Sequence, residues 1–170
     1  MKRKRIRLMC ISGMLTALVF VLTAYLHIPT NNGYVHVGDG LIYFAACMLP
    51  LPYAMAVGAV GALLADCLTG YAIWAPASVV IKAVTVLLFS SRTEKVMSLR
   101  NWLALFPAAL VCACGYYLYE CLIYGNLIAP LYGIPASLLQ SLVSSVIFVA
   151  IGLAVDETNY KSKLMGEFLK

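Results

Sequence analysis

Long apolar runs are the feature that most constrains the fold of this chain. Of its 170 residues, 63% are hydrophobic and only 11% are charged, and the mean hydropathy is +0.91. One soluble core cannot bury so much apolar surface, whereas a membrane-spanning helix uses about 20 such residues. The sequence predicts an all-α integral membrane protein, with one six-helix domain over 1–170 and no room for a soluble domain. The predicted spans lie near 8–26, 37–49, 53–69, 73–90, 102–124 and 136–155.

The first two spans are less regular than the others. The first resembles a signal peptide, but its apolar run from Leu8 to Leu26 is long and no small-x-small site follows, so we expect an uncleaved helix. The segment 41–49 has too few residues to cross about 30 Å at 1.5 Å per residue. We therefore expect the second span to begin near Val35, to tilt, or to lie in a thinned part of the fold.

The basic residues predict the orientation of the spans. Five of the twelve Lys and Arg residues lie in 2–7, three in 91–101 and three after 157, while the loops 27–39, 70–73 and 125–135 contain none. Positive charge favours the cytoplasmic side of a membrane. We therefore expect both termini in the cytoplasm, and we interpret the opening basic run as a membrane flank and not as a nucleic-acid patch.

Small residues recur every four positions on two of the predicted helices. In the third span they are Ala54, Gly58 and Ala62, with Gly61 and Ala65 one face over. In the first span they are Gly13 and Ala17. Small side chains let helices approach closely in lipid. The groove on the first span suits either another helix of this chain or a partner subunit.

Three ionisable side chains, Asp66, Lys82 and Glu120, fall inside apolar runs. A charge in the bilayer is costly, so each of them is a candidate for function. Counted from the outer turns at 1.5 Å per residue, the two acids lie roughly 6–8 Å deep and the lysine about 13 Å deep. All three are therefore expected in the outer half of the membrane.

Other polar and aromatic side chains share the faces of these three groups or lie in the outer loops. Their convergence on one side of the membrane predicts a ligand pocket, which needs mixed polarity in a partly apolar hollow. The candidate substrate-binding residues are Asn32, His36, Asp39, Asp66, Tyr71, Trp74, Ser78, Lys82, Tyr116, Glu120 and Gln140.

Simpler roles stay open for several of these candidates. Tyrosine and tryptophan near helix ends often form an interfacial belt. Asp39 before Gly40 suits a helix N-cap, and His36 suits a hydrogen bond within a loop better than metal coordination. Asp66 and Lys82 also have the alternative of pairing with each other to lower the cost of burial.

Signatures of catalysis and of metal or nucleotide binding are missing from the sequence. It contains no G-x-S-x-G, H-E-x-x-H or phosphate-binding glycine loop, and its six cysteines lie in apolar runs without a C-x-x-C pair. We expect no enzyme activity, no cofactor and no metal site. Uptake powered by ATP would require separate subunits.

Several short segments together resemble a known family. They are GYVHVGD at 33–39, IYFAA at 42–46, GALLAD at 61–66 with Gly70-Tyr71, APASVVIK at 75–82, Tyr119-Glu120 before Tyr124-Gly125, and Ile134-Pro135 before Leu138-Leu139-Gln140. Their order and spacing resemble the substrate-binding S components of energy-coupling factor (ECF) vitamin transporters, over roughly residues 10–155.

This resemblance implies a six-helix protein of the bacterial plasma membrane that captures a water-soluble vitamin or precursor from outside. It implies three partner chains, namely a transmembrane coupling subunit and two ATPase subunits. Gly13 and Ala17 match a small-x-x-x-small pair that packs against the coupling subunit in that family. The ligand in the family is held by the outer helix ends and by the first, third and fifth loops.

The branch that the chain most resembles includes proposed carriers of hydroxymethylpyrimidine, pyridoxine-type compounds and pantothenate. A flat nitrogen heterocycle can stack on Trp74 or Tyr116 and donate N–H groups to Glu120 or Asp66. Pantothenate, a carboxylate, would depend on Lys82 instead. We favour the heterocycle and keep pantothenate as the alternative.

Two other classes of protein compete with this interpretation. A stand-alone proton-coupled carrier would use Asp66, Lys82 and Glu120 as a relay, and its uptake would collapse with the proton gradient. A small membrane enzyme is disfavoured because no metal or nucleophile motif is present. An S component instead predicts tight binding without turnover, and transport only with the coupling subunits.

Overall fold

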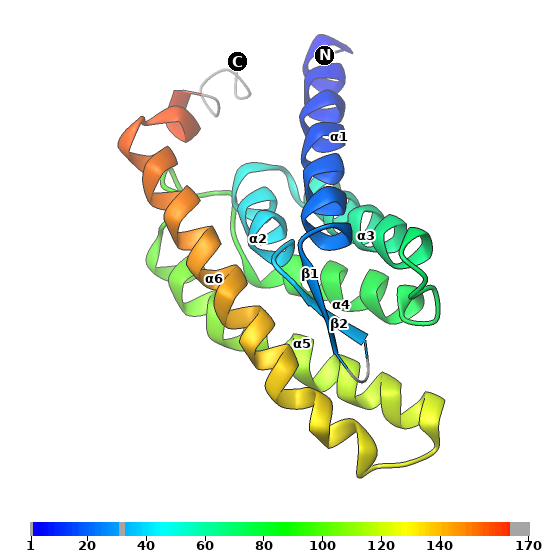
Figure 1. The fold of residues 1–170 in the computed structure, drawn as a ribbon. Helices are drawn as coiled ribbons and strands as arrows, with labels where there is room; N and C mark the ends of the chain where they lie inside the picture. The colour runs from blue at the N-terminus through cyan, green and yellow to red at the C-terminus, as the bar shows by residue number, and fades with distance from the viewer. Residues whose placement is uncertain (1, 31–32, 164–170) are drawn as a thin grey trace.

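The computed structural model describes residues 2–30 and 33–163, which form helices and one short hairpin (Figure 1). The elements are α1 Lys2–Ala24, β1 His27–Thr30, β2 Gly33–His36, α2 Asp39–Met48, α3 Leu51–Leu68, α4 Ala75–Leu88, α5 Leu99–Tyr124, the 3-10 helix η1 Ala129–Gly133, and α6 Ile134–Glu157. A helix stands at each of the six predicted positions, so the predicted helical architecture is confirmed.

The helices differ in whether they can cross a membrane. Within the described residues, four apolar helical segments are long enough, namely Lys2–Ala24, Leu51–Leu68, Leu99–Tyr124 and Ala129–Glu157. The helices α2 and α4 have 10 and 14 residues, which gives them lengths of about 15 Å and 21 Å. Six complete spans therefore stay a prediction, as does the cytoplasmic placement of the termini.

Helix α2 is short and is surrounded by protein. Nine of its ten residues are buried, and a helix that is apolar all round belongs in an interior. The Tyr43 ring stacks on Phe89, with 4.8 Å between ring centroids, and meets the Phe148 ring edge-on at 6.1 Å. An aromatic core thus joins α2 to the end of α4 and to α6.

A β-hairpin follows α1, where the sequence predicted only a loop. Its strands are antiparallel, with His27 opposite His36 and Thr30 opposite Gly33. Each strand has only four residues, too few for alternation to be recognised in the sequence. Because side chains alternate along a strand, Tyr34 and His36 lie on the same face of the hairpin.

The small residues of the third predicted span pack within the chain. A Cβ atom on Gly61 would lie 2.7 Å from Val19 of α1. A Cβ atom on Gly58 would lie 3.0 Å from Ile42 of α2 and 3.5 Å from the Cβ atom of Lys82. Helix α3 therefore brings α1, α2 and α4 together at close range.

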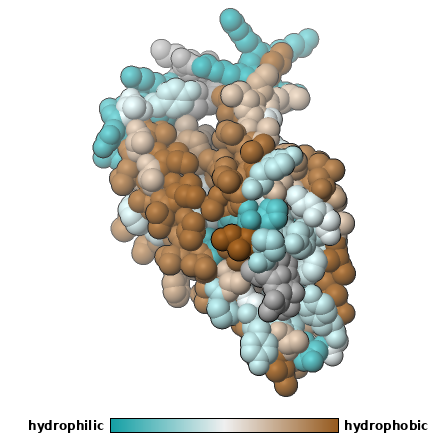
Figure 2. Space-filling view, viewed as in Figure 1, coloured by the Kyte–Doolittle hydropathy of each residue, from teal (hydrophilic) through white to brown (hydrophobic). Residues whose placement is uncertain are grey.

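The end of the molecule where α1 begins is also where α6 ends (Figure 1). Here two polar side chains hold the connection between α4 and α5. The buried Asn101 side chain donates to the carbonyl of Val96 at 2.8 Å, and the Asp156 carboxylate accepts from the backbone N–H groups of Val96 and Met97. Figure 2 shows hydrophilic side chains gathered at this end and hydrophobic ones over the middle of the molecule.

Glycine substitutions test this packing. The Cβ atom of Gly40→Ala would lie 2.7 Å from the backbone oxygen of Ser144 on α6, so we expect this variant to lose about 1–3 kcal/mol of stability. Gly13 has no atom within 4 Å of its added Cβ, so Gly13→Ala should be neutral or slightly stabilising. Thermal unfolding in detergent compares the two, and equal midpoints would contradict the close approach of α2 to α6.

Candidate functional site

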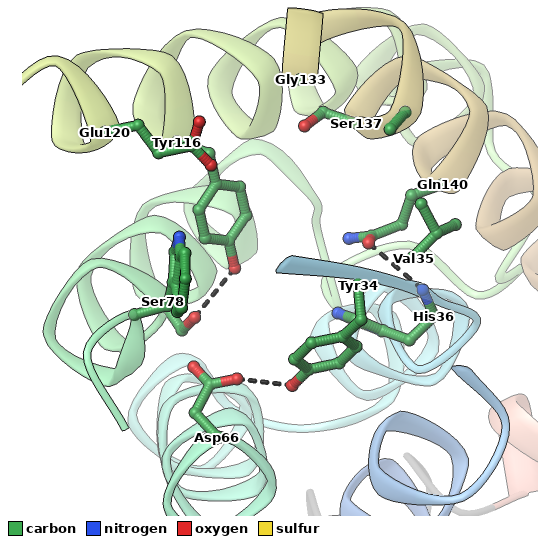
Figure 3. A pocket seen from close by; sticks show the side chains of 12 residues that line it. Tyr34, Val35, His36, Asp66, Ser78, Tyr116, Glu120, Gly133, Ser137 and Gln140 are labelled. Carbon is green, nitrogen blue, oxygen red and sulfur yellow. Dashed lines mark hydrogen bonds between the residues drawn. The ribbon is translucent and has the colours of Figure 1, made fainter. Parts of the chain in front are cut away.

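A polar cavity lies under the hairpin, between α3, α4, α5 and α6 (Figure 3). It contains about 540 Å³ of space that no atom fills, part of which is open to solvent. Its lining combines aromatic rings, carboxyl groups, hydroxyl groups and an amide, as in sites for small polar ligands. The lining residues are Tyr34, Val35, His36, Asp66, Trp74, Ser78, Tyr116, Glu120, Gly133, Ala136, Ser137 and Gln140.

An ion pair between Lys82 of α4 and Asp39 of α2 lies behind this lining. The Lys82 Nζ atom is 2.8 Å from Oδ1 and 2.9 Å from Oδ2 of Asp39, and the two side chains are 1% and 0% exposed. The Gln140 amide of α6 donates to the same Oδ2 atom at 2.9 Å, while its oxygen accepts from the backbone N–H of His36 at 3.3 Å. One buried network thus joins three helices to the hairpin.

Two hydrogen bonds cross the cavity itself, as Figure 3 shows. The Tyr34 hydroxyl donates to the Asp66 carboxylate, which joins the hairpin to α3. The Ser78 and Tyr116 hydroxyls are 2.9 Å apart and join α4 to α5. Among the described residues, the second Asp66 oxygen (Oδ2) and the indole nitrogen (Nε1) of Trp74 are buried without a hydrogen-bond partner. Besides the other polar groups of its lining, the cavity therefore offers the Asp66 Oδ2 atom as an acceptor and the Trp74 N–H group as a donor to a ligand.

Aromatic rings surround the Tyr34 side of the cavity. The Tyr34 ring lies 4.5 Å from that of Tyr71 and 4.9 Å from that of His27, and Tyr71 lies 5.9 Å from Trp74. The first two pairs are tilted and the third is edge-on, and contacts of this kind restrict the orientation of the rings. They provide flat apolar surfaces beside the Asp66 carboxylate.

The structure brings most of the predicted binding residues to one place. Seven of them line the cavity, namely His36, Asp66, Trp74, Ser78, Tyr116, Glu120 and Gln140. Tyr71 is not in the lining but contacts Tyr34 and Trp74. Asn32 lies outside the described residues.

Asp39 and Lys82 are placed differently from what the sequence suggested. Neither lines the cavity, because each is used by the other in the ion pair. The N-cap of α2 is Gly38, so Asp39 lies in the first turn and does not cap the helix. The suggested pairing of Lys82 with Asp66 is also wrong, because Lys82 pairs with Asp39 and Asp66 bonds to Tyr34.

Some lining residues were not among the candidates. Tyr34 lies in a predicted outer loop, where a role in the interfacial belt stayed open, and its place in the cavity depends on the unpredicted hairpin. Ser137 lies three residues before Gln140, on the same face of α6, so helical spacing alone could have found it. Val35, Gly133 and Ala136 carry no chemical signal that a sequence can reveal.

His36 is buried in β2, outside the helices, and its ring nitrogen Nδ1 accepts from the backbone N–H of Gly38 at 3.2 Å. Burial lowers the pKa of His36 from 6.5 to about 4, because the charged imidazolium loses its water. The imidazole is therefore neutral at physiological pH. This agrees with its expected role as a hydrogen-bonding residue of the segment after α1.

The fold and the cavity together define a membrane protein that binds a small molecule. Residues 3–157 match the family model of the ECF-type riboflavin transporter, S component, so the chain belongs to this family. A comparison with curated proteins gave no match. The protein is thus the substrate-binding subunit of a vitamin-uptake transporter, a multi-pass membrane protein and not an enzyme.

The buried ion pair predicts that mutations of Lys82 and Asp39 have non-additive effects on stability. Lys82→Met leaves the Asp39 charge without compensation, so we expect a loss of about 3–5 kcal/mol of stability, and Asp39→Asn should also destabilise. The double variant should recover much of this loss, because neither charge then stays buried alone. Thermal unfolding of all four proteins measures the coupling, and additive losses would contradict the pairing.

His36 predicts a pH dependence of stability. In the unfolded chain the His36 imidazole is protonated near pH 6.5, whereas in the folded chain it is protonated only near pH 4. The free energy of unfolding therefore falls as the pH is lowered through this window. The loss is up to about 3 kcal/mol. Unfolding midpoints between pH 7 and 4.5 should change less with pH in His36→Gln than in the unmodified protein. An unchanged slope in His36→Gln would contradict the burial of a neutral imidazole.

Proposed function

We propose that this S component binds a flat nitrogen heterocycle of the vitamin class in the cavity under the hairpin. The observation that carries the proposal is the buried Asp66 Oδ2 atom and the Trp74 N–H group, both without a protein partner. A heterocycle with a ring N–H or amino group and a ring acceptor satisfies both groups at once. Buried polar groups without partners are costly, so such a ligand gains affinity from both.

The charges of the lining support a heterocycle over pantothenate. The lining contains two acids, Asp66 and Glu120, and no Lys or Arg. The nearby Lys82 charge is compensated by Asp39 at 2.8 Å. A carboxylate ligand would meet acidic groups without a cation of its own, whereas an N–H donor meets acceptors.

The choice among heterocycles includes three candidates. Hydroxymethylpyrimidine and pyridoxine-type compounds follow from the resemblance of the sequence. The matching family model is named for riboflavin. Riboflavin is also a flat nitrogen heterocycle and is therefore the third candidate. The Tyr34 hydroxyl already donates to Asp66, so the ligand either uses the second carboxylate oxygen or displaces Tyr34.

Transport requires partners that this chain does not contain. Gly13 and Ala17 lie on the exposed surface of α1, where a transmembrane coupling subunit can pack closely against the helix. We propose that this subunit and two ATPase subunits complete the transporter in a bacterial plasma membrane. A proton relay through Asp66 and Lys82 is disfavoured, because the two belong to different pairs, with Tyr34 and with Asp39.

A thermal-shift panel on the purified protein tests the ligand class. The panel contains hydroxymethylpyrimidine, pyridoxine, riboflavin and pantothenate. A ligand that binds only the folded state adds about 2.7 kcal/mol at a hundredfold excess over its Kd. We expect one heterocycle to shift the midpoint and pantothenate to leave it unchanged. A shift with pantothenate alone would contradict the proposal.

Removing one charge from the cavity lining should weaken the binding of the same heterocycle. Asp66→Asn and Glu120→Gln each keep the shape of the side chain but lose the anionic acceptor, so we expect at least about tenfold weaker binding. Calorimetric titration of the heterocycle measures the change. The control is Glu94→Gln, an exposed acid on the connection between α4 and α5, and binding as weak in this control as in the lining variants would contradict a local effect.

The exposed small residues of α1 separate binding from transport. Ala17→Trp adds bulk on a surface that does not line the cavity, so vitamin binding should be unchanged. Uptake in liposomes that contain the coupling and ATPase subunits should be lost, because the helices can no longer approach closely. Leu18→Trp, at a neighbouring exposed position of α1, is the control. Full uptake by Ala17→Trp, or uptake by the chain alone, would contradict the proposed assembly.

A further inference from the structure

A second hollow lies between the first turns of α1 and the start of α3, far from the vitamin cavity. It is lined by Lys2, Lys4, Arg5, Leu8 and Tyr53, and we name these five residues the basic groove. The hairpin that covers the first cavity follows the other end of α1 (Figure 1). The basic groove therefore takes no part in the site described above.

The groove combines charge at its rim with an apolar floor. Lys2, Lys4 and Arg5 are exposed, and among the residues that the structure describes no acid lines the groove. Leu8 is only 5% exposed and lies one turn deeper along α1, while Tyr53 of α3 is half-buried. Three basic side chains of α1 thus line one side of the groove, and the Tyr53 ring of α3 lines the other.

Apolar surface continues from the groove toward the middle of the molecule. Met9 lies four residues after Arg5, on the same side of α1, and its side chain is 59% exposed. Val60, seven residues after Tyr53 on α3, is 42% exposed. A ligand with an anionic head and an apolar tail would contact both the basic rim and the apolar surface beyond it, whereas a free anion would contact only the rim.

We propose that the basic groove binds the phosphate group of an anionic phospholipid, with the acyl chains lying along the exposed apolar surface of α1 and α3. Lys and Arg side chains bind phosphate through charge-assisted hydrogen bonds. Basic pockets between transmembrane helices are suited to anionic headgroups. The Tyr53 hydroxyl provides a further donor, and such amphipathic rings favour the interface of a bilayer.

Native mass spectrometry of the full-length protein in detergent tests the proposal. The protein is offered equal amounts of phosphatidylglycerol and phosphatidylcholine, and retained lipid is counted. We expect one phosphatidylglycerol molecule to be retained at least about tenfold more often than phosphatidylcholine, because several basic groups act on one headgroup. The triple variant Lys2→Gln, Lys4→Gln, Arg5→Gln should lose this preference.

A matched triple variant separates the groove from the general basic charge of this end. Arg92→Gln, Lys95→Gln and Arg100→Gln remove three charges from the connection between α4 and α5 and its helix, so the preference should survive there. The two single variants Arg5→Gln and Arg3→Gln repeat the comparison within one helix. Arg5 lines the groove and Arg3 does not, so only Arg5→Gln should weaken the preference. This pair keeps the proposal testable if the triple groove variant does not fold.

Three results would overturn the proposal. One is an equal loss of preference in the groove and control variants, which would indicate diffuse attraction. Another is displacement of the lipid by inorganic phosphate at the same concentration, which would indicate a free-anion site. The third is an unchanged lipid preference in groove variants that no longer assemble with the coupling subunit, which would assign the groove to a protein partner.

Discussion

Lys82 and Asp39 meet in the interior of the helical bundle, and the rest of the site depends on this contact. Moving two charges out of water is costly, and close geometry with further hydrogen bonds is needed to offset the cost. Both Asp39 oxygens lie within 2.9 Å of Lys82 Nζ, and Gln140 adds a third donor. Gly58 lies beside the pair, where its missing side chain lets Ile42 of α2 pack closely against α3.

The same ion pair determines the chemistry that the cavity offers. Because Lys82 is compensated by Asp39, the lining keeps acids and hydroxyl groups but no free cation. Gln140 extends the network to the backbone of His36 and so places the hairpin that carries Tyr34. The charge of the lining therefore depends on a contact that lies behind the cavity.

The sequence predicted the positions of the helices and most of the cavity lining. Asp66 and Glu120 stood out because ionisable groups are rare in apolar runs, and helical spacing placed Ser78 and Tyr116 beside them. The partner of Lys82 could not be predicted, since Asp39 and Asp66 are both acids of the outer half and only the crossing of the helices selects one. The hairpin was missed because strands of four residues carry too little pattern, and Tyr34, which lies in it, was not among the candidates.

Hydrogen–deuterium exchange with the vitamin that stabilises the protein tests the central claim most directly. The account predicts slower exchange in the hairpin at 27–36 and in the segments around Asp66 and Trp74, because the proposed ligand site is the cavity under the hairpin. Exchange in the first turns of α1 should stay the same, since they lie at the other end of that helix. Protection confined to the first turns of α1, or an unprotected hairpin under a ligand that stabilises the protein, would contradict the account.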